Sequence, residues 1–220
     1  GGGRWHRGAA EQICVGRAVT VTDGVGLEDT RRWLERAVIG RNLCPLAKSV
    51  HGKGQVHYVV SQATDAPALR QDLMHELKAL QASDAEIRDT TLLIVPMCLQ
   101  DFLDFNDFLG EADQVLSKLD LAGLIQIASF HPQFQFAGTQ AGDIANFTNR
   151  APYPTLHLLR EASIERAVEV FPDAQAIFGK NIETLEKLGH AGWDALGVAR
   201  SASSPDTQVG ATGDAGRRKP

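Results

Sequence analysis

Residues 90–130, TTLLIVPMCLQDFLDFNDFLGEADQVLSKLDLAGLIQIASF, place a strand, a helix and a second strand in succession. The run 90–97 is too apolar for an edge strand, and it predicts a strand that is buried on both faces of a sheet. Over residues 102–119, apolar side chains recur every three or four positions, and Asp101 precedes them as a favourable N-cap. The apolar run 124–130 predicts the next strand. Strands that alternate with helices indicate an α/β protein.

The same alternation continues on both sides of this unit. The further predicted elements are a helix over 27–39, a strand over 55–60, a helix capped by Thr64 or Asp65, a strand or helical turn over 154–160, a helix capped by Ser163, and a helix from Asp173 to Leu188. For 154–160 we favour the strand. We therefore expect a single α/β domain over residues 27–197, a sandwich of one mixed, central sheet with flanking helices and right-handed crossovers. A ferredoxin-like α+β arrangement is the alternative.

The two ends of the chain lack this periodicity. Residues 1–26 are rich in glycine, which predicts a flexible N-terminal extension, and a cleaved organelle presequence is also compatible with their composition. Residues 198–220 are small and polar and contain proline and glycine, so we expect a disordered C-terminal tail.

The bulk composition excludes several classes of protein. The chain has 22 basic and 27 acidic side chains, a formal charge of −5, and no basic stripe, which argues against nucleic acid as a partner. No stretch approaches the roughly 20 apolar residues of a membrane span. Cys14, Cys44 and Cys98 have no paired spacing, so we expect reduced thiols and a cytoplasmic location.

The first candidate site follows the strand 124–130, in the sequence FHPQFQF. If this stretch stays extended, His131, Gln133 and Gln135 lie on one face and the phenylalanines on the other. Ligands of open α/β sheets bind outside the carboxyl ends of such strands. His131 is therefore the predicted general acid or base, because its ordinary pKa is near neutrality, and Gln133 is predicted to bind substrate. A hydrogen-bonded strand end is the equally weighted alternative.

The second candidate site is the long loop over 137–154, which two prolines stiffen. It presents Asn149, Arg150 and Tyr153, with His157 and Arg160 just beyond it. Arginine is the usual residue for gripping a carboxylate or phosphate by two hydrogen bonds. We therefore predict an anionic ligand, while the alternative is that each arginine pairs with a surface acid.

Cys44 is a third candidate, as a possible nucleophile. Our prediction places it after a helix and away from any helix N-terminus that would lower its pKa, so Arg41 or Lys48 would have to activate it. A buried and inert cysteine is the favoured alternative.

Four segments resemble the domain of unknown function 1415 family, which is mostly bacterial: WLERAVIGRNLCPLAK, FHPQFQFAG, NFTNRAPYPTLHLLREASIERAV and IFGKNIETLEKLG. They occur in the expected order over about residues 29–190. The resemblance implies membership of that family and no particular activity. It places residues 1–26 and 197–220 outside the shared domain. The positions inside the family's segments are Cys44, His131, Asn149, Arg150, His157, Arg160 and Asn181.

Two hypotheses about function follow. The first is a small-molecule enzyme that acts on an anionic metabolite, with His131 as general acid or base and Cys44 and His157 as further catalytic candidates. A variant of it adds a metal ion bound by His131 and His157 for redox or hydrolytic chemistry. The second hypothesis is a non-catalytic binding or assembly module in which the same side chains form a structural network. The sequence specifies neither a cofactor nor an oligomeric state.

Overall fold

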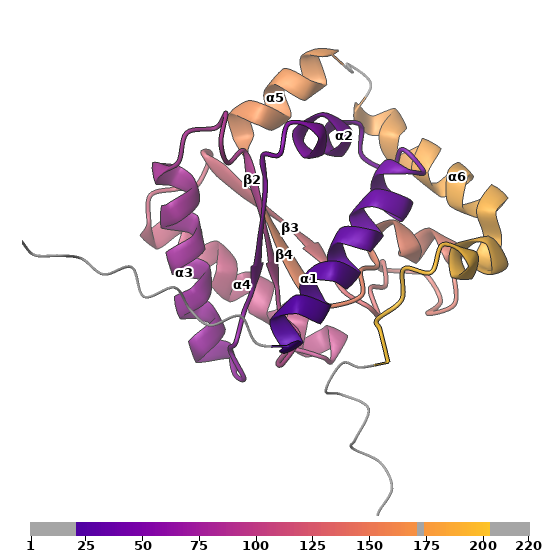
Figure 1. Ribbon diagram of the computed structural model, residues 1–220, viewed down its shortest axis with the longest axis horizontal. Coiled ribbons are helices and arrows are strands. Elements are labelled where there is room, and N and C mark those ends of the chain that lie inside the picture. Colours follow the sequence, from indigo (N-terminus) through magenta and orange to yellow (C-terminus); the bar gives the residue numbers. More distant parts are fainter. Residues whose placement is uncertain (1–20, 171–173, 203–220) are drawn as a thin grey trace, which may run out of the picture.

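The protein is described by a computed structural model over residues 21–170 and 174–202 (Figure 1). Within these residues a sheet of four strands has the order β1-β2-β4-β3. Its strands are β1 (Val56–Val60), β2 (Thr90–Ile94), β3 (Ile125–Phe130) and β4 (Thr155–Arg160). The pair β1 and β2 is parallel, whereas β4 is antiparallel to both β2 and β3. Three strands therefore run in one direction with β4 inserted against them, and the prediction of a mixed sheet flanked by helices is confirmed.

One face of the sheet is covered by α3 (Ala66–Ala82) and α4 (Phe102–Lys118). α3 connects β1 to β2, and α4 connects β2 to β3; in each case the two strands run in the same direction. Both connections also move across the sheet in the same direction. Because such connections are right-handed, both helices lie on one face of the sheet. Both predicted caps form: the Asp65 carboxylate accepts from the Ala68 N–H, and that of Asp101 accepts from Leu103 and Asp104. The core on this face joins the two helices to Leu93, Val95, Ile125, Leu156 and Leu158.

The opposite face is covered by α1 (Val21–Trp33), its π-helical continuation η1 (Leu34–Ile39), α2 (Pro45–Gly52) and α6 (Ala174–Ala195). Figure 1 shows α1 in front of the sheet and α4 behind it. The short 3-10 helix η2 (Ile144–Asn149) packs beside α6, and α5 (Glu161–Val170) follows β4 directly. The core here contains Trp33, Leu34, Ala37, Val38, Leu92, Ala151, Leu185 and Trp193.

Several predicted boundaries are wrong. α1 begins at Val21, six residues before the predicted start, and α2 was not predicted as a helix. Ser163 does not cap α5, because that helix starts at Glu161. Gly189, with φ of 64°, interrupts α6 without ending it.

The folded region also extends past the predicted domain end at its C-terminus. Val198 is buried, and the main-chain N–H of Ser201 donates to the Asp29 carboxylate at 2.9 Å. The rest of the predicted extension (1–20), Asp173 and the rest of the predicted tail (203–220) lie outside the described residues. No helix among the described residues is long and apolar enough to cross a membrane.

Candidate functional site

A cavity of about 400 Å³ lies at the edge of the sheet where β2 and β3 end. Gln100 follows β2, Gln133 follows β3, and Ala151 precedes the antiparallel β4. This is the edge at which ligands of open α/β sheets bind. We call the cavity the carboxyl-edge pocket. Its lining residues are Trp33, Gln100, Pro132, Gln133, Phe147, Arg150, Ala151, Pro152, Trp193, Val198, Ala199 and Arg200.

Arg150 carries a positive charge into this pocket. Its guanidinium lies 4.2 Å from the centre of the Phe147 ring. Its Nε donates to the Phe134 carbonyl at 3.3 Å and its Nη2 to the Ala141 carbonyl at 2.6 Å. Among the described residues, no carboxylate forms an ion pair with it, and burial lowers the pKa of Arg150. Arg150 is therefore a part-buried cation whose protein partners are carbonyl oxygens and an aromatic ring.

A second guanidinium comes from the C-terminal strap, by which we mean residues 196–202. Arg200 Nη2 donates to the Pro96 carbonyl and to Gln100 Oε1, both at 3.3 Å. Its guanidinium also lies 4.3 Å from the centre of the Tyr153 ring. Arg200 thus enters the pocket from a segment predicted to belong to a disordered tail.

Asp29 on α1 anchors this strap. The Tyr153 hydroxyl donates to Asp29 Oδ2 at 2.8 Å, and the Ser201 hydroxyl donates to Oδ1 at 2.5 Å. Arg32 bonds to the same Oδ1 at 2.5 Å and to the Gly197 carbonyl at 2.8 Å. Burial raises the pKa of Asp29, but hydrogen bonds from Ser201, Tyr153 and Arg32 outweigh it and the pKa falls. Tyr153, a predicted substrate ligand, is buried and supports the strap instead of lining the pocket.

His131 lies behind the pocket wall and is fully buried. Its ring packs against Phe102 and Phe105, with centroids 5.4 and 5.1 Å away. Its Nδ1 accepts from the Gln133 N–H at 3.0 Å, so Nε2 carries the proton and donates to the Leu99 carbonyl at 3.1 Å. Burial lowers the pKa of His131 although the hydrogen bond to Leu99 opposes it. Acid–base catalysis by His131 would therefore require the chain around His131 to open and expose its ring.

The predicted alternation after β3 does not occur, because the strand ends at Phe130 and the chain turns. The Phe134 N–H donates to the His131 carbonyl at 3.1 Å, closing the turn. Of the three polar side chains, Gln133 lines the pocket, while Gln135 donates to the Thr139 carbonyl at 2.6 Å. The expectation that they share one face with His131 is wrong.

Asn149 holds the end of β3 in place. Its Nδ2 donates to the Ser129 carbonyl at 3.2 Å, and its own carbonyl accepts from the His131 N–H at 3.1 Å. Asn149 is not among the residues that line the pocket, so its contacts position the His131 turn.

In a comparison with protein-family models, residues 26–195 match the model described as a protein of unknown function, DUF1415. The chain belongs to the DUF1415 family. No curated protein and no solved structure matches it. The DUF1415 match contains Arg150, Gln133 and both pocket tryptophans, whereas the strap residues of the pocket lie beyond it.

Cys44, His157 and Arg160 lie in a different part of the DUF1415 region. They line a small cavity of about 40 Å³ under α2. Cys44 is the N-cap residue of α2, so its predicted position away from a helix N-terminus is wrong. Burial nevertheless raises the pKa of Cys44, outweighing the hydrogen bonds from Ala47 and Leu46, so the thiol stays protonated near neutral pH.

His157 is held neutral in this cavity. The Thr90 hydroxyl donates to the Leu158 carbonyl at 2.7 Å, and it therefore accepts from His157 Nε2, also at 2.7 Å. Burial lowers the pKa of His157 to about 4. His157 and His131 lie on opposite faces of the sheet, because His131 packs under α4 and His157 faces α2. They cannot share one metal ion in this conformation, and no group of three His, Cys, Asp or Glu residues in the described ranges could hold one.

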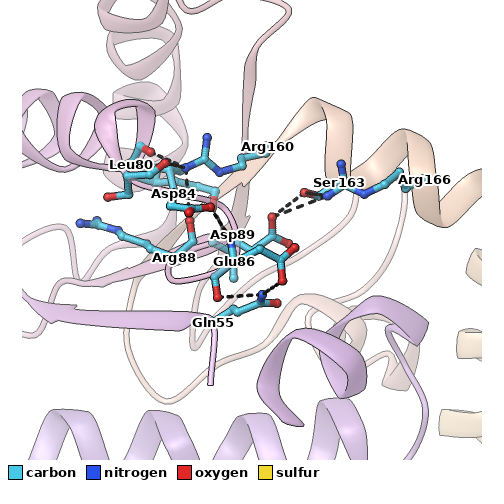
Figure 2. Close-up of polar contacts among 12 residues, drawn as sticks. Gln55, Leu80, Asp84, Glu86, Arg88, Asp89, Arg160, Ser163 and Arg166 are labelled. Carbon is cyan, nitrogen blue, oxygen red and sulfur yellow. Dashed lines mark hydrogen bonds and ion pairs between the residues drawn. The ribbon is translucent and has the colours of Figure 1, made fainter. Parts of the chain in front are cut away.

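Arg160 is a structural residue at the end of α3 (Figure 2). Its Nη2 donates to the carbonyls of Leu80, Ser83 and Arg88 at 2.6, 2.7 and 3.2 Å. These carbonyls belong to the C-terminal turn of α3 and the loop after it, where main-chain acceptors lack helical partners. Arg160 is not among the residues that line the carboxyl-edge pocket.

The residues of the pocket that were not singled out from the sequence include Trp33, Gln100, Trp193 and Arg200. Trp33 lies in one of the segments that resemble the family, and this was the only feature of the sequence that could have marked it as a site residue. Nothing local marks Gln100, Trp193 or Arg200, since each reaches the pocket through tertiary packing.

Proposed function

We propose that the chain binds a small anionic ligand with a flat apolar body in the carboxyl-edge pocket, and that Arg150 holds the anionic group. The observation that carries this proposal is the state of the Arg150 guanidinium. It has five N–H groups. Its hydrogen bonds to described residues use Nε and Nη2, and its Nη1 has no protein acceptor among them. A part-buried cation of this kind favours a carboxylate or phosphate.

The rest of the lining supports the same class of ligand. Trp33, Phe147 and Trp193 supply flat apolar surface, and the amides of Gln100 and Gln133 supply orienting hydrogen bonds. Binding sites for small molecules commonly combine apolar walls with a few polar groups in this way. Arg200 adds a second positive charge from the strap.

This lining favours binding more directly than catalysis. It contains neither a nucleophilic side chain nor one that ordinarily titrates near neutral pH. His131 as general acid or base, the enzymatic form of the hypothesis, depends on a ligand-induced opening of the turn that buries it.

Calorimetric titration and thermal shift with phenyl phosphate and benzoate test the proposal, with neutral benzamide as the matched control ligand. We expect the anions to bind and to raise the melting temperature, because a ligand that binds the folded state stabilises it by mass action. Arg150→Gln should weaken binding at least about tenfold, the equivalent of 1.4 kcal/mol. Arg70→Gln removes an arginine that pairs with Glu111 outside the pocket, and it should leave binding unchanged.

Arg150→Gln also removes hydrogen bonds that tie the loop together, so a second variant separates binding from folding. Ala199→Phe adds a ring at an exposed strap position on the pocket wall and should block the ligand without touching Arg150. The proposal fails if benzamide binds as well as phenyl phosphate, or if both variants retain full affinity for the anions.

A further inference from the structure

A second cavity, of about 270 Å³, lies at the opposite edge of the sheet, between α2 and α5. Its floor comes from residues that immediately precede β1 and β2, so we call it the amino-edge cavity. Figure 2 shows Gln55, Glu86 and Asp89 gathered there, with Ser163 and Arg166 reaching Asp89 from α5. The cavity shares no lining residue with the carboxyl-edge pocket. Its lining residues are Pro45, Leu46, Ser49, Val50, Lys53, Gln55, Ala85, Glu86, Asp89, Ser163, Arg166 and Ala167.

Asp89 is a buried carboxylate with one oxygen left for a ligand. Only 6% of the residue is exposed. The Ser163 hydroxyl donates to Oδ1 at 2.5 Å, and the Arg166 guanidinium lies 3.9 Å from the same oxygen. No donor among the described residues bonds to Oδ2. A carboxylate on a buried residue is unfavourable unless cations or hydrogen-bond donors surround it, and Asp89 lines the amino-edge cavity, so Oδ2 is the acceptor that a ligand there can use.

Gln55, a second buried residue, supplies another acceptor beside Asp89. Only 5% of Gln55 is exposed, and its main-chain carbonyl accepts from the Asp89 N–H at 3.0 Å, which makes the two residues neighbours. Its side-chain Nε2 donates to the Glu86 carbonyl at 3.0 Å. This bond directs the amide nitrogen toward Glu86 and leaves Oε1 as an acceptor, with no donor in the described part of the chain. Two neighbouring acceptors that belong to buried residues and have no described donor suit a ligand that donates several hydrogen bonds.

The charges around the cavity indicate which charged groups the ligand carries besides its hydrogen-bond donors. Asp89 and Glu86 contribute two negative charges, and Lys53 and Arg166 contribute two positive charges at the exposed rim. A simple cation would be repelled by the positive charges of Lys53 and Arg166 at the rim, and a simple anion would be repelled by the Asp89 carboxylate. A zwitterion, with its ammonium inward and its carboxylate toward the rim, satisfies both ends.

We infer that the amino-edge cavity binds a small zwitterionic amino acid with an aliphatic side chain. Its ammonium donates to Asp89 Oδ2 and Gln55 Oε1, and its carboxylate pairs with Arg166 and Lys53. Apolar contacts come from Leu46, Val50 and Ala167, which lie on α2 and α5. The volume suits a ligand of this size, because it lies just below the usual range for larger cofactors and drugs.

Titration calorimetry with three probes of one shape tests the inference: L-leucine, leucinamide without the carboxylate, and 4-methylpentanoate without the ammonium. We expect leucine to bind best, leucinamide about tenfold more weakly from losing the rim ion pair, and 4-methylpentanoate not at all. Asp89→Asn should abolish leucine binding, because its amide replaces an acceptor with a donor. Asp113→Asn, on the exposed face of α4, is the matched control and should bind leucine normally.

Asp89→Asn also alters the contact with Ser163, so Ala167→Phe provides an independent check by filling the cavity from α5. The inference is overturned if the wild type binds neither leucine nor leucinamide. It is equally overturned if 4-methylpentanoate binds as well as leucine, or if Ala167→Phe leaves leucine binding intact. Phenyl phosphate binding at the carboxyl-edge pocket should not change in these variants, so the two proposals can fail separately.

Discussion

The two edges of the sheet use charge in opposite ways. At the carboxyl edge, Arg150 is a cation whose described partners are carbonyl oxygens and an aromatic ring, and the pocket lining contains no carboxylate. At the amino edge, Asp89 is a buried carboxylate that the exposed Arg166 neutralises only in part. These charges are the basis of the two proposals, an anionic ligand at the carboxyl edge and an ammonium group at the amino edge.

Arg150 and Arg160 show the same contrast within one residue type. Both belong to one sequence segment, and both were predicted to hold an anion. Arg160 donates from Nη2 to three carbonyls at the end of α3 and lines a cavity of about 40 Å³, whereas Arg150 lines the carboxyl-edge pocket of about 400 Å³. The difference shows that an arginine marks a candidate anion site only where the fold places it beside a cavity that can hold a ligand.

The largest expected effect is that of Arg160→Met. Loss of the guanidinium leaves three part-buried carbonyls without a charged donor, so we expect the free energy of unfolding to fall by about 4 kcal/mol. Urea denaturation measures it. Arg166→Met, at a side chain that is 64% exposed, is the control and should change stability by less than about 1 kcal/mol. Equal effects of the two variants would remove the structural role given to Arg160.

His131→Ala should cause the next largest loss of stability. It deletes a buried ring and both of its main-chain hydrogen bonds, which predicts a loss of about 3 kcal/mol in urea denaturation. Gln133→Ala, at the exposed neighbour, should change stability by less than about 0.5 kcal/mol. A His131→Ala protein that keeps its stability but loses ligand-dependent chemistry would instead support the general acid–base role.

His157 predicts a pH dependence of stability. Burial lowers its pKa to about 4 in the folded protein. The unfolded chain, with a pKa near 6.5, takes up the proton first as the pH falls, so stability is complete above about pH 6.5 and declines toward pH 4. The expected loss is about 2 kcal/mol by pH 5. Denaturation across this range should show a shallower decline for His157→Gln; identical wild-type and variant slopes would contradict the prediction.

Ser201→Ala should have the smallest effect on stability, about 1 kcal/mol, because the Ser201 main-chain bond to Asp29 remains. It should also weaken phenyl phosphate binding severalfold, since the strap that carries Arg200 loses one anchor. Ser117→Ala, whose hydroxyl bonds only within α4, is the matched control for both measurements. Unchanged affinity in Ser201→Ala would show that the strap does not position the ligand.

Local sequence determined most of the elements, and for local reasons. The helices α3 and α4 follow from apolar spacing and from caps at Asp65 and Asp101, and β2 follows from a run too apolar to be exposed. α2 was missed because eight residues contain too few turns to establish a period. The strap was missed because it has no period at all, and Asp29, far away in the chain, orders it.

In the candidate site, too, some features depend on local sequence and others on the tertiary structure. The sequence by itself determined that a strand ends at Phe130, that polar side chains follow it, and that Arg150 belongs to a stiff loop, because these depend on neighbours in the chain. Only the tertiary structure decided that His131 is buried, that Arg160 closes a helix and that Arg200 enters the pocket. Burial and hydrogen-bond partners come from residues distant in sequence, and they determine which charged groups remain available to a ligand.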